Sequence, residues 1–467
     1  MPDNARQNHV IPRIVIVGGG FGGLEVAKAL GEAGIRATIV DRQNRHLFQP
    51  LLYQVATAAL SAADVAEPIR KILGRHRSIQ VIYGEVERVD MGTRRLLLSD
   101  RTAIAFDLLV LATGSRPFYI GREDWAATAP GLKTIENARA IRSRLLLAFE
   151  HAERTTDPEE QRRLMTFAVI GGGPTGVEIA GSIAELSRHT LVRDFRNIRP
   201  ERTRILLVEA GDRILGSFVP ELSEYAQRGL EKLGVEVVTG KRVDAIGDQI
   251  SIEGDVIPVG LTLWAAGVAA SPLAGDLGVD RDRGGRVAVD GNLQVVGCHG
   301  VFALGDVALC RGEDGQPLPG LAQVAKQQGI YLGKALAERI RGGTAIPPFV
   351  YRSRGNTAIV GRHARCSNPG GSGSRAGLRG SLGRSSTSTS SSASSIASKY
   401  RSSGCGATSH MSAVHGWLRR NTSSRRSSGS RRVTRTRLGP PGRVDHRFDR
   451  WNRERLQRSL IVLGPQG

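Results

Sequence analysis

The chain has few cysteines and no long apolar run, and both shortages exclude classes of protein. Among 467 residues there are four cysteines, at none of the spacings typical of a zinc site, an iron–sulfur cluster or a disulfide framework. We therefore expect no metal and a reducing compartment. No stretch approaches the roughly 18 consecutive apolar residues of a spanning helix, and the first residues lack the apolar region of a signal peptide. Any contact with a membrane is expected to be peripheral.

Acidic residues are scarce only in the last part of the chain. The whole sequence has 65 basic and 44 acidic residues, but 19 basic and only 3 acidic residues lie from Cys366 onward. The remainder is nearly balanced in charge, so the basic character belongs to an appendage and says little about the partners of the rest. The total length predicts two or three domains, at roughly 100 to 200 residues each.

A glycine-rich turn follows the first apolar run, IVIVGGGFGG. The spacing Gly18-x-Gly20-x-x-Gly23 is the dinucleotide-binding fingerprint: the first glycine makes the turn, the second lets the backbone approach a pyrophosphate, and the third lets the helix pack on the sheet. A second strand ends in Asp41, 23 residues after Gly18. The expected distance for a carboxylate that binds a ribose hydroxyl is roughly 20 residues. A solvated aspartate at a strand end is the alternative.

The same pattern returns 153 residues later as GGGPTGVE, with Gly171-x-Gly173-x-x-Gly176 after another buried-type strand. Two such patterns predict two nucleotide-binding folds. The second carboxylate, Glu209, lies 38 residues after Gly171, and we interpret residues 188–200 as an insertion that lengthens this spacing.

Charge near the second pattern bears on the choice of cofactor. A carboxylate at Glu209 repels a 2′-phosphate and favours NADH over NADPH, whereas the nearby Arg213 would favour NADPH.

The remaining segments predict further elements of an α/β fold. Residues 79–89 and 95–98 indicate a small antiparallel excursion, and residues 135–163 a polar helix. Continuous apolar runs predict buried strands at 107–114, 261–267 and 301–306. The helix expected at 321–341 carries Gln323 and Gln327 on one face, with a solvated face as the alternative.

Taken together, the stretches RHLFQPLLYQVATAALS, GGGPTGVE, WAAG, VFALGD and LAQVAKQQG resemble type II NADH:quinone oxidoreductases, a family of the two-dinucleotide-binding-domain flavoproteins. The resemblance covers about residues 10 to 363. It implies an α/β fold with two Rossmann-like domains, the NADH domain being inserted in the FAD domain. The expected boundaries are 10–118 and 276–363 for the FAD domain, 119–275 for the NADH domain, and 364–467 for a disordered tail.

The resemblance also implies roles for individual residues. FAD binding is expected of Gly18, Gly20, Gly23, Asp41, Thr113, Gly114 and Asp306, with Asp306 at the ribityl chain. Cofactor binding is also expected of Phe21, Gly22, Gly267 and Gly305. NADH binding is expected of Gly171, Gly173, Gly176 and Glu209.

Three further residues are expected to act in catalysis. Glu178, placed in the first turn of the second helix, resembles the family glutamate beside the nicotinamide and flavin rings. A mere complement to the helix dipole is the alternative. Gln323 and Gln327 match the A-Q-x-x-x-Q motif that lines the quinone site.

The function implied is hydride transfer from NADH to FAD, followed by reduction of a quinone, ubiquinone or menaquinone. The family works at the inner face of the cell membrane, and a homodimer is a further expectation. Related disulfide reductases and sulfide:quinone reductases need cysteines beside the flavin, and the first cysteine here is Cys298. A soluble NADH:acceptor reductase of the ferredoxin-reductase type is the alternative enzyme.

The last 102 residues depart from the family pattern. They contain 23 serines and 19 basic residues without any period, a composition typical of disorder. The family continues instead with a compact region that ends in membrane-binding helices, and we therefore expect this anchor to be missing here. Either the tail is natural, or an out-of-frame reading of the gene begins near His363, which we favour. Nucleic acid is not an expected partner, although a flavoprotein with a nucleic-acid-binding tail is a third alternative.

Overall fold

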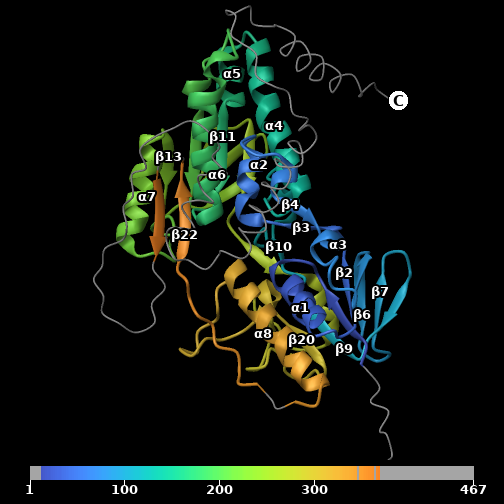
Figure 1. Ribbon diagram of the computed structural model, residues 1–467. Coiled ribbons are helices and arrows are strands. Elements are labelled where there is room, and N and C mark those ends of the chain that lie inside the picture. The colour runs from blue at the N-terminus through green and yellow to red at the C-terminus, as the bar shows by residue number, and fades with distance from the viewer. Residues whose placement is uncertain (1–11, 344–345, 362–363, 369–467) are drawn as a thin grey trace, which may run out of the picture. The chain divides into compact units, whose positions relative to one another are not determined.

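The computed structural model describes residues 12–343, 346–361 and 364–368, which all belong to one compact unit of the chain (Figure 1). The predicted basic tail from residue 369 onward lies outside the described residues. Within the described part, no helix is both long and apolar enough to cross a bilayer.

The first sheet is parallel, in the strand order β20-β9-β1-β2-β5. Alternate residues of β1 serve its two faces: Ile14 and Ile16 pack with helices α1 and α8, whereas Val15 and Val17 pack with the antiparallel strands β6 and β7. Every residue of β1 is therefore buried, which explains its uninterrupted apolar sequence. The bounds are β1 Ile14–Val17, β2 Ala37–Asp41, β5 Ile79–Tyr83, β9 Leu108–Leu111, β20 Val301–Ala303, β6 Val86–Asp90, β7 Arg95–Leu98, β8 Ala103–Ala105, α1 Phe21–Glu32 and α8 Ala322–Ile340.

The second sheet repeats this arrangement in the order β13-β12-β11-β17, again parallel. Phe167 and Val169 of β11 face helices α4 and α6, and Ala168 and Ile170 face the antiparallel strands β14–β16 and Trp264. The two sheets confirm the predicted α/β fold class with two Rossmann-like folds. The bounds are β11 Thr166–Ile170, β12 Arg204–Val208, β13 Val235–Val238, β17 Leu261–Trp264, β14 Val243–Ile246, β15 Gln249–Ile252, β16 Asp255–Pro258, α4 Ile135–Arg154, α5 Pro158–Leu164, α6 Pro174–Glu185 and α7 Pro220–Lys232.

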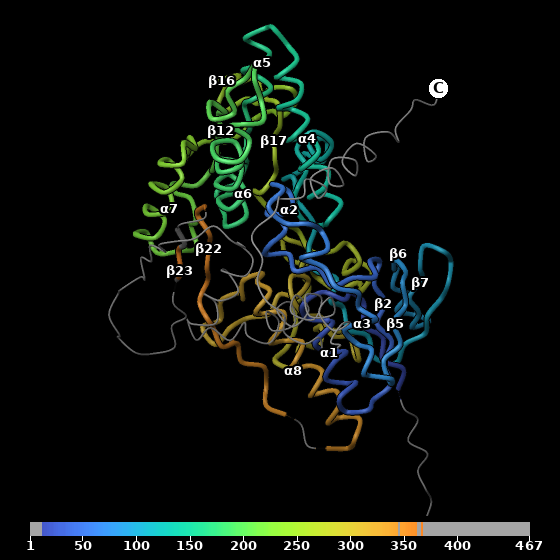
Figure 2. Tube along the Cα trace, turned by 45° about the horizontal axis from the view of Figure 1, so that its top comes forward, coloured from blue at the N-terminus to red at the C-terminus, as the bar shows by residue number. Residues whose placement is uncertain are grey.

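Helices α1 and α8 lie side by side although about 300 residues separate them in the sequence (Figures 1 and 2). Glycines allow this close approach. A Cβ on Gly22 would meet the carbonyl oxygen of Ala325 at 2.9 Å, and one on Gly333 would meet that of Val26 at 3.0 Å. Helix α8 is therefore fixed against the helix that begins at the first glycine-rich turn.

Two short crossing strands connect the folds. Strand β10 (Ser115–Pro117) pairs antiparallel with β18 (Val268–Ala270), so the chain leaves the first fold and returns to it through one ribbon. Trp264 reinforces this connection, since its indole N–H donates to the carbonyl oxygen of Phe118 at 2.9 Å. The remaining elements are α2 Leu52–Ala56, α3 Ile69–Ile72, β3 Arg45–Leu47, β4 Ala66–Pro68, β19 Val287–Ala288, β21 Ala308–Leu309, β22 Asn356–Val360 and β23 Ala364–Asn368.

Three sequence-based expectations need correction. The segment 79–89 is not one antiparallel excursion, because β5 joins the parallel sheet as its edge strand and only β6–β8 are antiparallel. The polar helix ends at Arg154, and α5 starts separately because Pro158 disfavours helical backbone at Asp157, which caps the new helix. Residues 364–368 are not a disordered segment, since they form β23, which pairs with β22 beside α7 (Figure 2).

Candidate functional site

The first glycine-rich turn connects β1 to α1, and its three glycines are required for different reasons. Gly18 has a φ of +104°, which side chains rarely adopt, and a Cβ on Gly23 would overlap the carbonyl oxygen of Gly18. Gly20 has ordinary extended backbone at the N-cap of α1, and a Cβ there would meet nothing within 4 Å. Gly18 and Gly23 thus serve the fold, whereas Gly20 leaves open space at a helix N-terminus.

The second turn, between β11 and α6, has the same division of roles. Gly171 has a φ of +109°, and a Cβ on Gly176 would overlap the carbonyl oxygen of Gly171. Gly173 is again an N-cap residue with extended backbone and open space where a Cβ would be. Each turn therefore presents a helix N-terminus, with its dipole, to open space of the kind that binds a pyrophosphate.

A carboxylate closes each turn in the same way. Asp41 accepts from the backbone N–H of Gly19 at 2.5 Å and of Gln43 at 2.6 Å. Glu209 accepts from Gly172 at 2.6 Å and from Gly211 at 2.7 Å. Each carboxylate therefore binds the backbone N–H that directly follows the first glycine of its turn, at Gly19 or Gly172. Its contact with a ribose stays a prediction.

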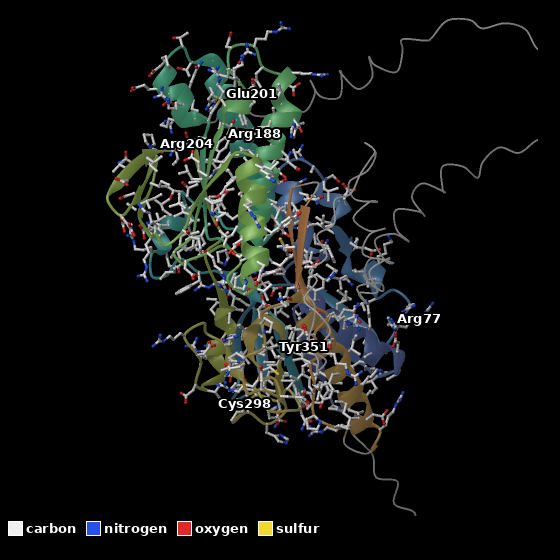
Figure 3. All side chains as sticks on the ribbon, turned by 90° about the vertical axis from the view of Figure 1, so that its left-hand side faces the viewer. Arg77, Arg188, Glu201, Arg204, Cys298 and Tyr351 are labelled. Carbon is white, nitrogen blue, oxygen red and sulfur yellow. The ribbon has the colours of Figure 1, made fainter. Side chains whose placement is uncertain are left out.

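The insertion in the second fold explains how Glu209 reaches this position. It contains a π-helical turn at Leu186–Thr190 and ends in a short 3₁₀ turn at Pro200–Arg202. Arg188 donates to the carbonyl oxygen of Thr203 at 3.1 Å, at the amino end of β12, where Figure 3 shows it near Glu201 and Arg204. The extra residues are thus accommodated at the end of β12 opposite to Glu209.

Aromatic rings pack against one another beside the first turn. The ring of Phe21 makes edge contacts with His46 and Phe48, with centroids 5.1 Å and 5.8 Å away. His46 also contacts the carbonyl oxygen of Gly19 through Nδ1 at 3.1 Å. Burial raises the pKa of the Asp41 carboxyl, and the bonds from Gly19 and Gln43 oppose this shift. The first site is an enclosed one.

Arg213 lies near the second carboxylate but is used within its own loop. Its Nη2 donates to the carbonyl oxygens of Gly216 at 3.0 Å and Phe218 at 3.4 Å. These bonds hold Nη2 on the loop backbone, while Nε is buried without a partner in the described part of the chain. The influence of Arg213 on the choice between NADH and NADPH therefore stays a prediction.

The other residues expected to bind a cofactor lie in separate places: Thr113 and Gly114 between β9 and β10, Gly267 between β17 and β18, and Gly22 in α1. The hydroxyl of Thr113 is buried and has no partner in the described part of the chain. Gly114 has a φ of +68°, and its carbonyl accepts from Ser271. The carbonyl of Gly267 accepts from Phe118 at 3.1 Å. Gly22 faces α8, so its missing Cβ serves helix packing, and a contact with FAD stays a prediction.

Asp306 is held in a small polar network. Its Oδ2 accepts from the Ser115 hydroxyl at 2.6 Å, and the Lys133 ammonium donates to the same hydroxyl at 3.0 Å. The preceding Gly305 donates its N–H to Oε1 of the buried Gln328 at 2.8 Å. Ser115, Gly305, Asp306 and Gln328 line a cavity of roughly 330 Å³.

Sequence reasoning missed Ser115, Lys133 and Gln328. A signal existed only for Gln328, an amide that shares the buried face of α8 with Val324. Nothing in the spacing of Ser115 or Lys133 indicates that they meet Asp306, because they lie in separate segments.

Glu178 lies in the second turn of α6, not in the first as expected. The helix dipole acts mainly within the first turn, so this position weakens the alternative that Glu178 only complements the dipole. Its Oε1 accepts from the backbone N–H of Ile359 in β22 at 3.3 Å. Burial raises the pKa of the Glu178 carboxyl to about 8, against a lowering by this hydrogen bond. Glu178 can therefore hold a proton near neutral pH.

Gln323 and Gln327 both face the segment that leads to β22. Gln323 donates to the carbonyl oxygen of Gly355 at 2.7 Å, and Gln327 exchanges hydrogen bonds with the backbone of Arg352 at 3.0 Å and 3.1 Å. Both side chains are half-buried, so they do not form the solvated face that was the alternative. Their place at a quinone stays a prediction.

These residues fit FAD in the first fold. The open space at Gly20, the N-terminus of α1 and the Asp41 carboxylate are the features that an ADP moiety requires. The unpartnered hydroxyl of Thr113 is a buried polar group that a ligand can satisfy.

Comparison with known proteins gives the class first. Residues 12–329 match the family model described as pyridine nucleotide-disulphide oxidoreductase. The type II NADH:quinone oxidoreductase NdhA of Mycobacterium tuberculosis is 40% identical over 375 residues, which are 77% of this chain and 79% of the relative. The demethylphylloquinone reductase NdbB of Synechocystis is 33% identical over 355 residues, 72% of this chain and 81% of the relative.

The chain therefore belongs to the type II NADH:quinone oxidoreductases, as the sequence motifs indicated.

Solved structures agree on the fold. The structure of NDH2 from Plasmodium falciparum in complex with NADH matches with a TM-score of 0.70 at 20% identity, over 77% of this chain and 90% of that one. A putidaredoxin reductase–putidaredoxin complex matches with a TM-score of 0.60 at 21% identity, over 77% of this chain and 81% of that one. At such identities the likeness shows the fold alone.

Proposed function

We propose that this protein is an FAD-dependent NADH:quinone oxidoreductase of the respiratory, non-pumping kind. The observation that carries the proposal is the pair of glycine-rich turns. Each has open space at a helix N-terminus and a carboxylate that accepts from the backbone N–H after its first glycine. FAD, when bound, supplies the chemistry by which the hydride of NADH becomes two electrons for a quinone. The protein supplies binding, orientation and control of protons.

In the first fold, the backbone at Gly20 binds the FAD pyrophosphate and Asp41 binds the adenosine ribose. Phe21 helps to enclose this end of the cofactor, because its ring packs against His46 and Phe48. At the other end, Asp306 would accept a hydrogen bond from a hydroxyl of the ribityl chain. Ser115 donates to Oδ2 of Asp306 and so orients this carboxylate. The enclosed character of this site suits a cofactor that stays bound.

In the second fold, Gly173 and Glu209 bind NADH in the corresponding way. Glu209 favours NADH because it accepts a hydrogen bond from a 2′-hydroxyl and repels a 2′-phosphate. We expect the bonds of Arg213 to the loop backbone to keep its guanidinium from offsetting this repulsion. This loop is exposed at residues 210–212, which suits a substrate that exchanges in every turnover.

The acceptor side is formed by α8 and the segment that leads to β22. Gln323 and Gln327 orient the quinone with amide groups, and their bonds to residues 352 and 355 hold the wall of that site. Glu178 lies where β22 meets α6 and holds or releases a proton near neutral pH.

The proposed substrate indicates where in the cell the protein works. A quinone with a long apolar tail is dissolved in the bilayer, so we place the protein at the inner surface of the cell membrane, attached peripherally without the apolar anchor of the family. Flotation with vesicles of anionic lipid at low and high salt tests this placement. A homodimer stays a prediction, which sedimentation of the FAD-loaded protein tests.

The central test measures the two half-reactions separately. The purified protein, loaded with FAD, is mixed anaerobically with NADH and then with a short-chain quinone, and flavin absorbance is followed in stopped flow. We expect bleaching by NADH and recovery by quinone. Bleaching without recovery by quinone, together with recovery by a ferredoxin, would instead favour the soluble acceptor reductase.

A further inference from the structure

Lys133 is linked to the candidate ribityl residue Asp306 through the Ser115 hydroxyl, and no motif assigned it a role. It immediately precedes the capping box of α4, where Asn137 Oδ1 accepts from the backbone N–H groups of Lys133 at 3.3 Å and Thr134 at 3.1 Å. These bonds fix the backbone of Lys133. Its side chain reaches out of the inserted segment to the Ser115 hydroxyl, at 3.0 Å.

Ser115 transmits this contact to the first fold. It lies in the crossing strand β10 and donates its hydroxyl proton to Asp306 at 2.6 Å, while it accepts from Lys133. A hydroxyl can make both bonds at once, because it has one donor and two acceptor positions. Lys133, Ser115 and Asp306 therefore form a directed chain that ends on a carboxylate oxygen.

The charge of Lys133 is unusual for its surroundings. The side chain is half-buried, and burial lowers the pKa of its ammonium, whereas the Asp306 carboxylate opposes that shift. A lysine in such a position costs desolvation free energy, which is recovered only through favourable charge interactions. The desolvation cost at Lys133 indicates that this side chain has a function beyond folding.

We infer that Lys133 is a positioning residue of the flavin site, which orients Asp306 through Ser115 and places a positive charge beside bound FAD. The inference rests on the proposed function, because it requires FAD in the first fold. It also means that a segment of the second fold supplies a charge to a site of the first fold, whose cavity is also lined by Arg283 and Arg286.

Two consequences follow for the bound cofactor. Losing Lys133 frees the Ser115 hydroxyl to turn away from Asp306, so the carboxylate is less well placed for the ribityl chain. Losing the positive charge also disfavours the reduced flavin, since reduction adds negative charge to the site.

The experiment compares Lys133→Met, Lys133→Arg and Ser115→Ala, with Lys334→Met as a matched control on the exposed face of α8. FAD affinity is measured by equilibrium titration of apoprotein, and the reduction potential by titration against a redox dye. We expect Lys133→Met to weaken FAD binding about tenfold and to shift the reduction equilibrium about tenfold toward oxidised flavin, which is about 30 mV for a two-electron couple.

The other variants separate charge from orientation. Lys133→Arg keeps the charge and should keep the potential, whereas Ser115→Ala should weaken FAD binding with little change in potential. Lys334→Met should change neither. If Lys133→Met does not fold, as judged by circular dichroism, these two milder variants still decide the question.

An unchanged potential and FAD affinity in Lys133→Met, or a fall in potential in Lys133→Arg equal to that in Lys133→Met, would overturn the inference. The result is distinct from a failure of the proposed function. Wild-type protein that binds FAD but reduces no quinone counts against the proposed function, whereas Lys133 is judged by affinity and potential alone.

Discussion

The two glycine-rich turns have the same backbone but different surroundings. Their first glycines have φ values of +104° and +109°, and each carboxylate accepts from the second glycine of its turn and from the residue two positions after itself. Asp41 is followed by β3 and the rings of His46 and Phe48, whereas Glu209 is followed by the exposed residues 210–212. The shared part defines dinucleotide binding, and the different parts separate a retained cofactor from an exchanging substrate.

The most damaging change to the first site is Gly20→Val. Its extended backbone at φ −72° is accessible to valine, so the fold is retained while the side chain fills the space for the pyrophosphate. We expect FAD affinity to fall by at least about 100-fold, or about 2.7 kcal/mol. Absorbance at the flavin band after gel filtration measures the loss, and Gly216→Val, in open space on a loop, is the control.

A yellow Gly20→Val protein with full flavin content would show that the cofactor is bound elsewhere.

The matching change in the second site is Gly173→Val, at φ −69°. It should leave FAD bound and weaken NADH by a similar factor, about 100-fold. Stopped-flow bleaching of the flavin at increasing NADH concentration measures the change. Loss of FAD in this variant would break the comparison, because the two turns would then not serve separate dinucleotides.

Glu209→Gln tests what the second carboxylate recognises. The amide keeps the size of the side chain but loses the charge, so NADH should bind about tenfold more weakly and NADPH should be discriminated against less. Steady-state kcat/KM for both nucleotides measures the ratio, with Glu201→Gln at the other end of β12 as control. If the ratio does not change, another residue distinguishes the 2′-position.

Gln323→Leu and Gln327→Leu test the acceptor side. Each loses an amide and the bond to the segment before β22, so we expect quinone reduction to slow by about tenfold while bleaching by NADH stays nearly intact. Gln249→Leu, on an exposed strand, is the control. Equal slowing of both half-reactions would mean that the two glutamines only hold the fold together.

The smallest expected effect is a pH dependence of stability that originates at Glu178. Its pKa is raised to about 8 in the folded protein, so the folded state holds a proton that the unfolded state has lost. Stability therefore falls as pH rises from about 4.5 to about 8 and levels off above that.

Glu178→Gln should remove this component. The Tm of the variant relative to wild type should increase between about pH 4.5 and about pH 8 and stay constant above that, as measured by scanning calorimetry. A constant difference in Tm would show that the Glu178 carboxyl has an ordinary pKa.

Local sequence patterns predicted most of the secondary structure, and the wrong predictions have clear causes. β5 is only partly buried, as edge strands are, and a sequence alone does not distinguish such a strand from an antiparallel one, because periodicity reports burial and not the pairing partner. The helix expected at 135–163 is interrupted at Asp157, where the local effect of Pro158 outweighed the helical period.

For the candidate site, the sequence by itself determined the two turns, because each needs glycines and a carboxylate at short, fixed spacings. Only the tertiary structure decided that Arg213 donates to a carbonyl of its own loop and that Gln323 and Gln327 face residues 352–356. It also decided that Lys133 is linked to Asp306 through Ser115. These contacts join segments up to 191 residues apart. A sequence pattern records spacing along the chain. Which distant side chains meet depends on how the elements that carry them, such as β10 and the start of α4, pack in three dimensions.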